Sequence, residues 1–312
     1  MKESAKQLLW KIIFFIGIAF CLLPFADPPM ALLAGLLISQ TIGHPFPYSA
    51  AKYSKYLLQG SVVGLGFGMN LSEAAKAGQT GFVFTLCSIC LTLLVGILLG
   101  KWLKNNKKIS YLVSSGTAIC GGSAIAAVGP LIAAEKTEMS IALGIVFILN
   151  SIALLIFPYI GHYLQLTEPQ FGLWSAIAIH DTSSVVGAAQ KYGPKALEIA
   201  TTVKLERALW IIPLSFFTAF YFKNKDAKFK FPVFILFFIA AMAISTYIPS
   251  ISPVTPYIVL AAKKGMTITL FLIGCGLSRK AIRSVGFNPL LQGIILWILI
   301  SVISLIVIIK IG

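Results

Sequence analysis

Residues 116–127 read Gly-Thr-Ala-Ile-Cys-Gly-Gly-Ser-Ala-Ile-Ala-Ala, and residues 178–189 read Ala-Ile-His-Asp-Thr-Ser-Ser-Val-Val-Gly-Ala-Ala. Both stretches place small and hydroxylated residues in the middle of long apolar segments. A continuous helix satisfies its own backbone in lipid, so an unwound segment is tolerated only where protein or a watery cavity surrounds it. The two stretches therefore predict broken helices over residues 111–134 and 171–190, an arrangement from which transporters build their binding sites.

The composition places these breaks in a membrane protein. Of 312 residues, 58% are hydrophobic and only 11% are charged, whereas a soluble domain is roughly 25% charged. The apolar runs are long enough for transmembrane helices and lack the alternation that a membrane barrel would show. We therefore predict an all-α, polytopic membrane protein that forms a single transporter domain over residues 1–312.

Eleven spans are expected from the apolar runs. They cover residues 9–23, 30–43, 57–71, 78–100, 111–134, 140–161, 171–189, 196–222, 231–248, 257–277 and 289–309. Lysines at positions 2, 6 and 11 place the N-terminus in the cytoplasm, and most later cytoplasmic loops also carry Lys or Arg. The net charge of +15 thus indicates orientation in a bacterial inner membrane, and nucleic acid is not an expected partner.

One loop departs from this pattern. Residues 162–170 should be cytoplasmic by the span count, yet they contain no Lys or Arg. If residues 178–189 formed a re-entrant hairpin, all later loops would change sides and the lysine-rich loop at 223–230 would face outward. We therefore predict a full crossing for this element. The count then makes both broken elements run outward, although inverted repeats would cross them in opposite directions.

A weak internal repeat accompanies the breaks. A Pro-Tyr pair, two lysines and a six-residue stretch that begins with Gly and has Leu-Ser at its fourth and fifth positions recur in the segments 30–100 and 231–310. By the span count, residues 57–71 run outward and residues 257–277 run inward. This relation is expected of inverted-topology repeats, which many secondary transporters contain.

The breaks offer hydrogen-bond donors to an anion. The helix that follows an unwound segment begins with free N–H groups and a partial positive charge. The expected substrate-binding residues are Gly121, Gly122 and Ser123 in the first break and Thr182, Ser183 and Ser184 in the second. Hydroxyl groups in membrane helices also often bond back to their own turn, which is the alternative for each Ser and Thr.

The second break also carries the ionisable groups. His180 and Asp181 are candidates for a proton-coupling step because histidine titrates near neutral pH, although Asp181 could simply cap the following helix. Lys204 and Arg207 share a helix face near the middle of the next span. They are predicted to bind substrate by offsetting its charge; the alternative is that their side chains reach the membrane surface.

The combined motifs resemble those of the YeiH family of bacterial membrane proteins, which are described as sulfate exporters. The resemblance rests on residues 116–127 and 178–188 together with Lys204-Leu205-Glu206-Arg207. It implies a bacterial inner-membrane secondary transporter, distantly similar to sodium/proton antiporters and bile-acid symporters, whose folds cross two broken helices at mid-membrane.

Together these features predict a secondary active transporter that exports a small anion such as sulfate, a sulfonate or a carboxylate, with a proton-linked step. The alternatives are a sodium/proton exchanger that uses Asp181, a passive anion channel, and an intramembrane enzyme that uses His180, Asp181 and Ser183. We expect no enzymatic activity, no cofactor and no metal site. Membrane lipid is the expected surrounding, and the chain could form a homodimer.

Overall fold

A computed structural model describes residues 2–41, 47–222, 233–277 and 286–311. These residues form helices and contain no strand, as the sequence predicts. Four helical segments are long and apolar enough to cross a membrane, Thr85–Trp102, Lys136–Tyr163, Thr255–Gly276 and Phe287–Lys310. An all-helical membrane protein is therefore supported, whereas the number of eleven spans is not confirmed. The basic loops expected at 223–230 and 279–283 lie outside the described residues.

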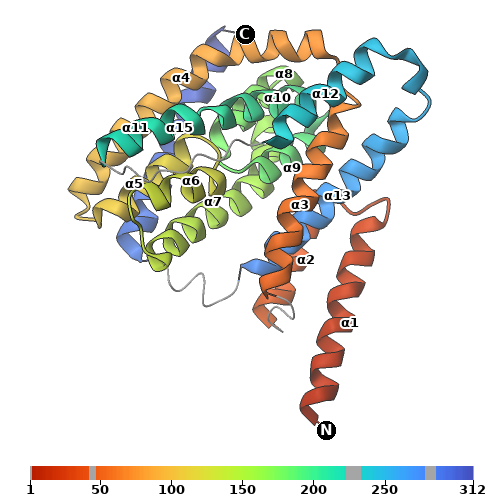
Figure 1. Ribbon diagram of the computed structural model, residues 1–312, viewed down its shortest axis with the longest axis horizontal. Coiled ribbons are helices and arrows are strands. Elements are labelled where there is room, and N and C mark those ends of the chain that lie inside the picture. Colours follow the sequence, from red (N-terminus) through yellow and green to blue (C-terminus); the bar gives the residue numbers. More distant parts are fainter. Residues whose placement is uncertain (1, 42–46, 223–232, 278–285, 312) are drawn as a thin grey trace. The chain divides into compact units, whose positions relative to one another are not determined.

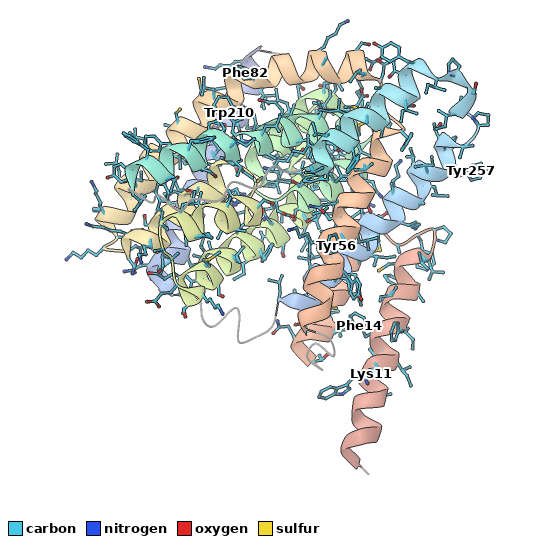
Figure 2. The ribbon with its side chains drawn as sticks, in the orientation of Figure 1. Lys11, Phe14, Tyr56, Phe82, Trp210 and Tyr257 are labelled. Carbon is cyan, nitrogen blue, oxygen red and sulfur yellow. The ribbon has the colours of Figure 1, made fainter. Side chains whose placement is uncertain are left out.

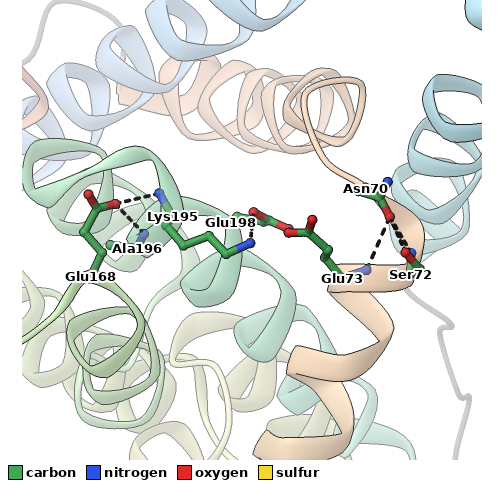
Figure 3. A network of polar contacts seen from close by, with 7 residues as sticks. All are labelled: Asn70, Ser72, Glu73, Glu168, Lys195, Ala196 and Glu198. Atoms are coloured by element: carbon green, nitrogen blue, oxygen red, sulfur yellow. Dashed lines mark hydrogen bonds and ion pairs between the residues drawn. The ribbon is translucent and has the colours of Figure 1, made fainter.

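The chain divides into two compact units, residues 1–73 with 233–280 and residues 74–232 with 281–312. The first unit contains α1 (Lys2–Leu22), α2 (Pro28–Thr41), α3 (Pro47–Gly66), α12 (Val233–Tyr247), a 3-10 turn (Pro249–Ile251) and α13 (Thr255–Gly276). It also contains the start of α4 (Leu71–Trp102), where Asn70 accepts hydrogen bonds from the N–H groups of Ser72 and Glu73 (Figure 3).

Helix α13 is the centre of the first unit and packs against α1, α2 and α3. Small residues allow these close contacts: Gly35 of α2 and Gly274 of α13 each face the backbone of the other helix. Residues Ser61 and Gly64 of α3 meet Gly265 and Ala262 of α13, so α3 and α13 run in opposite directions. This agrees in direction with the expected repeat, although the repeat itself stays a prediction.

The second unit contains the two predicted breaks. Its further helices are α5 (Lys107–Ala118), α6 (Gly122–Leu131), α7 (Lys136–Tyr163), α8 (Glu168–Ala178), α9 (Thr182–Tyr192), α10 (Pro194–Leu209), α11 (Ile211–Tyr221) and α15 (Phe287–Ile311). Residues 119–121 separate α5 from α6, and residues 179–181 separate α8 from α9. Figure 1 shows α7 running beside α6 and α9, which it contacts.

Local sequence explains where these helices begin and stop. Asn106 caps α5 by accepting the N–H of Lys108 at 2.8 Å, and Thr167 forms a capping box with Gln170 at the start of α8. Gly121 has φ +63° and ψ −118°, a conformation that essentially only glycine adopts without strain. The chain therefore leaves the helix after Ala118, turns at Gly121 and resumes a helix at Gly122.

The first broken element is a re-entrant hairpin and not a crossing. Lys108, at the start of α5, donates from Nζ to the carbonyl oxygen of Ala133, just after α6, at 2.7 Å. Both ends of the element therefore lie together. Each half-helix is about 15–18 Å long at 1.5 Å per residue, which is about half of a 30 Å membrane core.

The second broken element is also a hairpin, so the prediction of a full crossing is wrong. Glu168, at the start of α8, accepts the N–H groups of Lys195 at 2.7 Å and Ala196 at 3.3 Å, immediately after α9 (Figure 3). The hydroxyl of Tyr192 donates to the carbonyl of Leu166 at 2.5 Å, and its ring stacks on Phe171 at 3.8 Å between centroids. These contacts bring the two ends of the element together.

The hairpins insert from opposite ends of α7. This helix has 28 residues, begins beside the open end of α5–α6 and finishes beside the open end of α8–α9. Helices α10 and α11 then return, because Tyr111 near the start of α5 bonds Thr218 of α11 at 2.8 Å and its ring lies 5.4 Å from that of Phe222. The earlier expectation that both broken elements run in the same direction is thereby corrected.

This topology also explains the loop without basic residues. The end of α7 where the first hairpin opens carries Lys101, Lys104, Lys107, Lys108 and Lys136, and we call it the lysine-rich end. Residues 162–170 lie at the opposite end of α7. If α7 crosses the membrane, as its length and composition allow, these residues lie on the other side, where the rule for basic residues does not require them.

Candidate functional site

The tips of the two hairpins meet at the middle of α7. A Cβ atom placed on Gly121 would lie 3.6 Å from both Cα and Cβ of Asp181 and 2.9 Å from Cγ1 of Val146. Gly121 belongs to the first tip, residues 119–121, and Asp181 to the second, residues 179–181. The distances to Asp181 are those of ordinary van der Waals contact, so the two tips pack directly against each other and both breaks lie at one buried point.

Asn150 of α7 supports the second tip. Its Oδ1 accepts the N–H of His180 at 3.0 Å and that of Asp181 at 3.3 Å, and its side chain is only 2% exposed. These two backbone groups have left the helix, so without Asn150 they would be buried and unpaired. A helix that follows the first hairpin thus stabilises the second.

Two cations of α10 bond to the carbonyls at which the first half-helices end. Lys204 donates from Nζ to the oxygens of Ile179 at 2.6 Å and Ala176 at 3.2 Å, at the end of α8. Arg207 donates from Nη2 to the oxygen of Ala118 at 2.5 Å, at the end of α5. The C-terminus of a helix carries partial negative charge, so both cations stand where that charge is concentrated.

Arg207 also reaches the neighbouring helix. Its Nη1 donates to Oγ of Ser88 in α4 at 2.6 Å. Lys204 and Arg207 are both fully buried, so neither reaches a membrane surface. Their depth agrees with the sequence prediction, but their bonds are to helix ends, and a direct contact with substrate stays a prediction.

The two second half-helices begin differently. Asp181 caps α9, where its Oδ2 accepts the N–H groups of Ser183 at 3.0 Å and Ser184 at 3.4 Å and also the hydroxyl of Ser183. At α6 the N-cap is Gly121, so no cap side chain accepts the N–H groups of Gly122 and Ser123, while the thiol of Cys120 lies close to Ser123 and to the N–H of Ala124. Of the two helix starts that the sequence offers to an anion, only that of α6 has no carboxylate on its first N–H groups.

Several buried polar atoms around the tips have no hydrogen-bond partner among the described residues. These are both ring nitrogens of His180, Nε of Arg207, Nδ2 of Asn150 and the hydroxyl of Thr117. His180 is fully buried within electrostatic reach of Lys204 and Arg207. Most of these atoms are donors, and each such group costs about 1–3 kcal/mol if it stays unpaired. The region is suited to a ligand or waters that accept hydrogen bonds.

The predicted site residues are therefore only partly brought together. Gly121, His180, Asp181, Lys204 and Arg207 converge at the tips. Ser123 is exposed, Gly122 and Thr182 are partly buried, and Ser183 and Ser184 are buried and engaged by Asp181. Sequence reasoning missed Asn150, although a single carboxamide within a 28-residue apolar helix was a signal for it.

Two re-entrant helical hairpins that meet inside an apolar helical unit define a membrane protein with a buried polar centre. The family model described as conserved hypothetical protein 698 matches residues 20–293, and the chain belongs to this family. This agrees with the resemblance to the YeiH proteins.

The similar proteins are named only as membrane proteins. A UPF0324 membrane protein of Bacteroides thetaiotaomicron is 56% identical over 286 residues, which cover 90% of this chain and 86% of the relative. The corresponding protein of Porphyromonas gingivalis is 55% identical over 282 residues (89% and 86%), and that of Bdellovibrio bacteriovorus is 47% identical over 302 residues (95% and 93%). No solved structure matches the chain.

Proposed function

We propose that this protein is a secondary active transporter that exports a small anion, such as sulfate, a sulfonate or a carboxylate, across the bacterial inner membrane. The observation that carries the proposal is the group of buried, unpartnered donors at the hairpin tips, on Arg207, Asn150, Thr117 and His180. An anion with several oxygens would accept these hydrogen bonds, and the start of α6 would add backbone donors. The lysine-rich end of the second unit then faces the cytoplasm.

The meeting of two hairpins from opposite sides supports a transporter rather than a static pore. A ligand at the tips is separated from each side of the membrane by one hairpin, so alternating access requires movement of one hairpin at a time. A sodium exchanger is less well supported. The carboxylate of Asp181 already accepts three hydrogen bonds at the start of α9, and a bound cation would have to compete with them.

Transport by purified protein in liposomes tests this proposal. Radiolabelled sulfate, methanesulfonate and acetate are supplied under opposed gradients, with radioactive sodium as the competing cation. We expect flux of at least one anion, and accumulation against its gradient would exclude a channel. If no anion moves faster than in empty liposomes, or if only sodium moves, the proposal is wrong.

A matched pair of variants tests the site. Thr117→Val removes a buried hydroxyl that has no hydrogen-bond partner among the residues that the structure describes, so the fold should not be destabilised. We expect KM for the transported anion to rise at least about tenfold, because a hydrogen bond to a charged group contributes about 1.5–3 kcal/mol. The control is Thr269→Val in α13, whose hydroxyl bonds to the carbonyl of Gly265 at 2.8 Å, and its KM should stay unchanged.

A further inference from the structure

Glu206 is an ionisable group of the second unit to which the anion site gives no role. It lies on α10, directly before Arg207, and is partly exposed, whereas Lys204 and Arg207 are fully buried. An ionisable side chain inside a membrane segment is costly and is therefore functional by default. The contacts of Glu206 indicate what that function is.

Both oxygens of Glu206 are held by neutral donors. Thr85 of α4 donates from Oγ1 to Oε2 at 3.1 Å, and Trp210 donates from Nε1 to Oε1 at 3.3 Å. The ring of Trp210 packs against Phe82 of α4 at 5.6 Å between centroids (Figure 2). If Glu206 takes a proton on Oε2, the hydroxyl of Thr85 can turn and accept a hydrogen bond from the new O–H group. Trp210 continues to donate to Oε1. The side chain can therefore keep its position in both protonation states.

The surroundings of Glu206 contain one charged neighbour among the described residues, Arg207, which lies within electrostatic reach. The hydrogen bonds of Arg207 go to Ser88 and Ala118, so the guanidinium does not tie up the carboxylate. The facing side of α4 carries the neutral Thr85, Ser88 and Thr92, all buried. Two residues earlier on α10, Lys204 is engaged by the end of α8.

The other two candidates for a proton site are less suited to it. Protonation of Asp181 would weaken the acceptor that caps α9. Protonation of His180 would add a third positive charge beside Lys204 and Arg207, at a ring whose nitrogens have no acceptor among the described residues. Protonation of Glu206 neither weakens a helix cap nor adds a positive charge.

We infer that Glu206 carries the coupling proton of transport. Its carboxylate takes a proton from water to become a carboxylic acid and returns that proton to water on the other side of the membrane after the conformational change. Each protonation removes the negative charge beside Arg207, which holds the tip of the first hairpin through Ala118. The inference rests on the proposed function, since it assigns the coupling site of that transporter.

The decisive variant is Glu206→Gln, because glutamine is fixed in the neutral form and keeps both contacts. Its Oε1 accepts from Trp210 and its Nε2 donates to Thr85. The matched control is Glu198→Gln on the same helix, where the carboxylate pairs with Lys195 at 3.1 Å (Figure 3). Labelled sulfate is the first probe, replaced by whichever anion of the panel the wild type transports.

We expect Glu206→Gln to keep anion-for-anion exchange. Its accumulation of the anion under a pH gradient should be at least tenfold lower than that of the wild type. Glu198→Gln should keep the response to the gradient. An infrared difference spectrum between acid and alkaline pH gives a readout without transport: the band of a protonated carboxyl should disappear in Glu206→Gln and remain in Glu198→Gln.

The inference is overturned if Glu206→Gln keeps pH-driven accumulation, if the wild type moves the anion without regard to the pH gradient, or if the carboxyl band persists in Glu206→Gln. Failure of the proposed function is a separate result. In that case the wild type moves no anion, and the infrared comparison alone decides whether Glu206 takes up a proton.

Discussion

Gly121→Ala tests the contact between the hairpin tips. The alanine must adopt a φ of +63° with a ψ of −118°, and this backbone conformation costs about 1–3 kcal/mol for a residue other than glycine. Its Cβ would also lie 2.9 Å from Cγ1 of Val146, and such overpacking costs a further amount of about 1–3 kcal/mol. We therefore expect a loss of about 2–6 kcal/mol in the free energy of unfolding.

The two terms can be separated by thermal unfolding in detergent. The double variant Gly121→Ala/Val146→Ala relieves the clash but not the backbone strain. Adding Gly121→Ala to Val146→Ala should therefore lower the melting temperature less than adding Gly121→Ala to the wild type. Gly122→Ala is the control, because its Cβ would lie 3.4 Å from Leu143 at the start of a helix, an ordinary contact. If Gly121→Ala and Gly122→Ala melt at the same temperature, the tip geometry described above is refuted.

Three further substitutions test the groups that hold the hairpins. Asn150→Ala leaves the N–H groups of His180 and Asp181 without their acceptor and should cost about 2–6 kcal/mol, measured as a lower melting temperature; a variant as stable as the wild type would contradict the role given to Asn150. Lys204→Met removes two charge-assisted bonds to the end of α8 and leaves their carbonyls unpaired, so we expect lower stability together with loss of transport, with partial recovery in Lys204→Arg; full transport in Lys204→Met would argue against this support. Glu168→Ala removes the acceptor that joins the open end of the second hairpin to α10, and a loss of about 0.5–2 kcal/mol is expected from a missing cap; hydrogen exchange should increase at Lys195 and Ala196, and unchanged exchange there would show that the cap contributes nothing.

The sequence located both breaks because their residues have local physical consequences. Adjacent glycines at 121 and 122 weaken a helix, and an Asp before Thr-Ser-Ser at 181 is a strong start signal. The direction of the chain after each break could not be predicted in this way. A half-helix, a break and a second half-helix have the same composition in a crossing and in a hairpin, and the difference rests on distant contacts such as Lys108 with Ala133.

One signal in the sequence did bear on the topology. The absence of Lys and Arg from residues 162–170 conflicts with two full crossings and agrees with a hairpin at the first break, which puts this loop at the end of α7 opposite the lysine-rich end. A hairpin at the second break then restores the parity of the later loops. The burial of Lys204 and Arg207 followed from their depth in the span. Their hydrogen bonds to Ile179 and Ala118 could not be predicted, because the sequence does not indicate which carbonyls the folded chain leaves free.

The insertion of two hairpins from opposite sides is tested most directly by the accessibility of single cysteines. Cysteine is placed at the exposed positions Lys107, Lys136, Gln165 and Lys191 in a chain whose five native cysteines are replaced, and each variant is treated with a membrane-impermeant maleimide in intact cells and in inverted vesicles. We predict that positions 107 and 136 react from one face and that positions 165 and 191 both react from the other. Reaction of 107 and 136 from opposite faces, or of 165 and 191 from opposite faces, would show that the broken elements cross the membrane and would contradict the account.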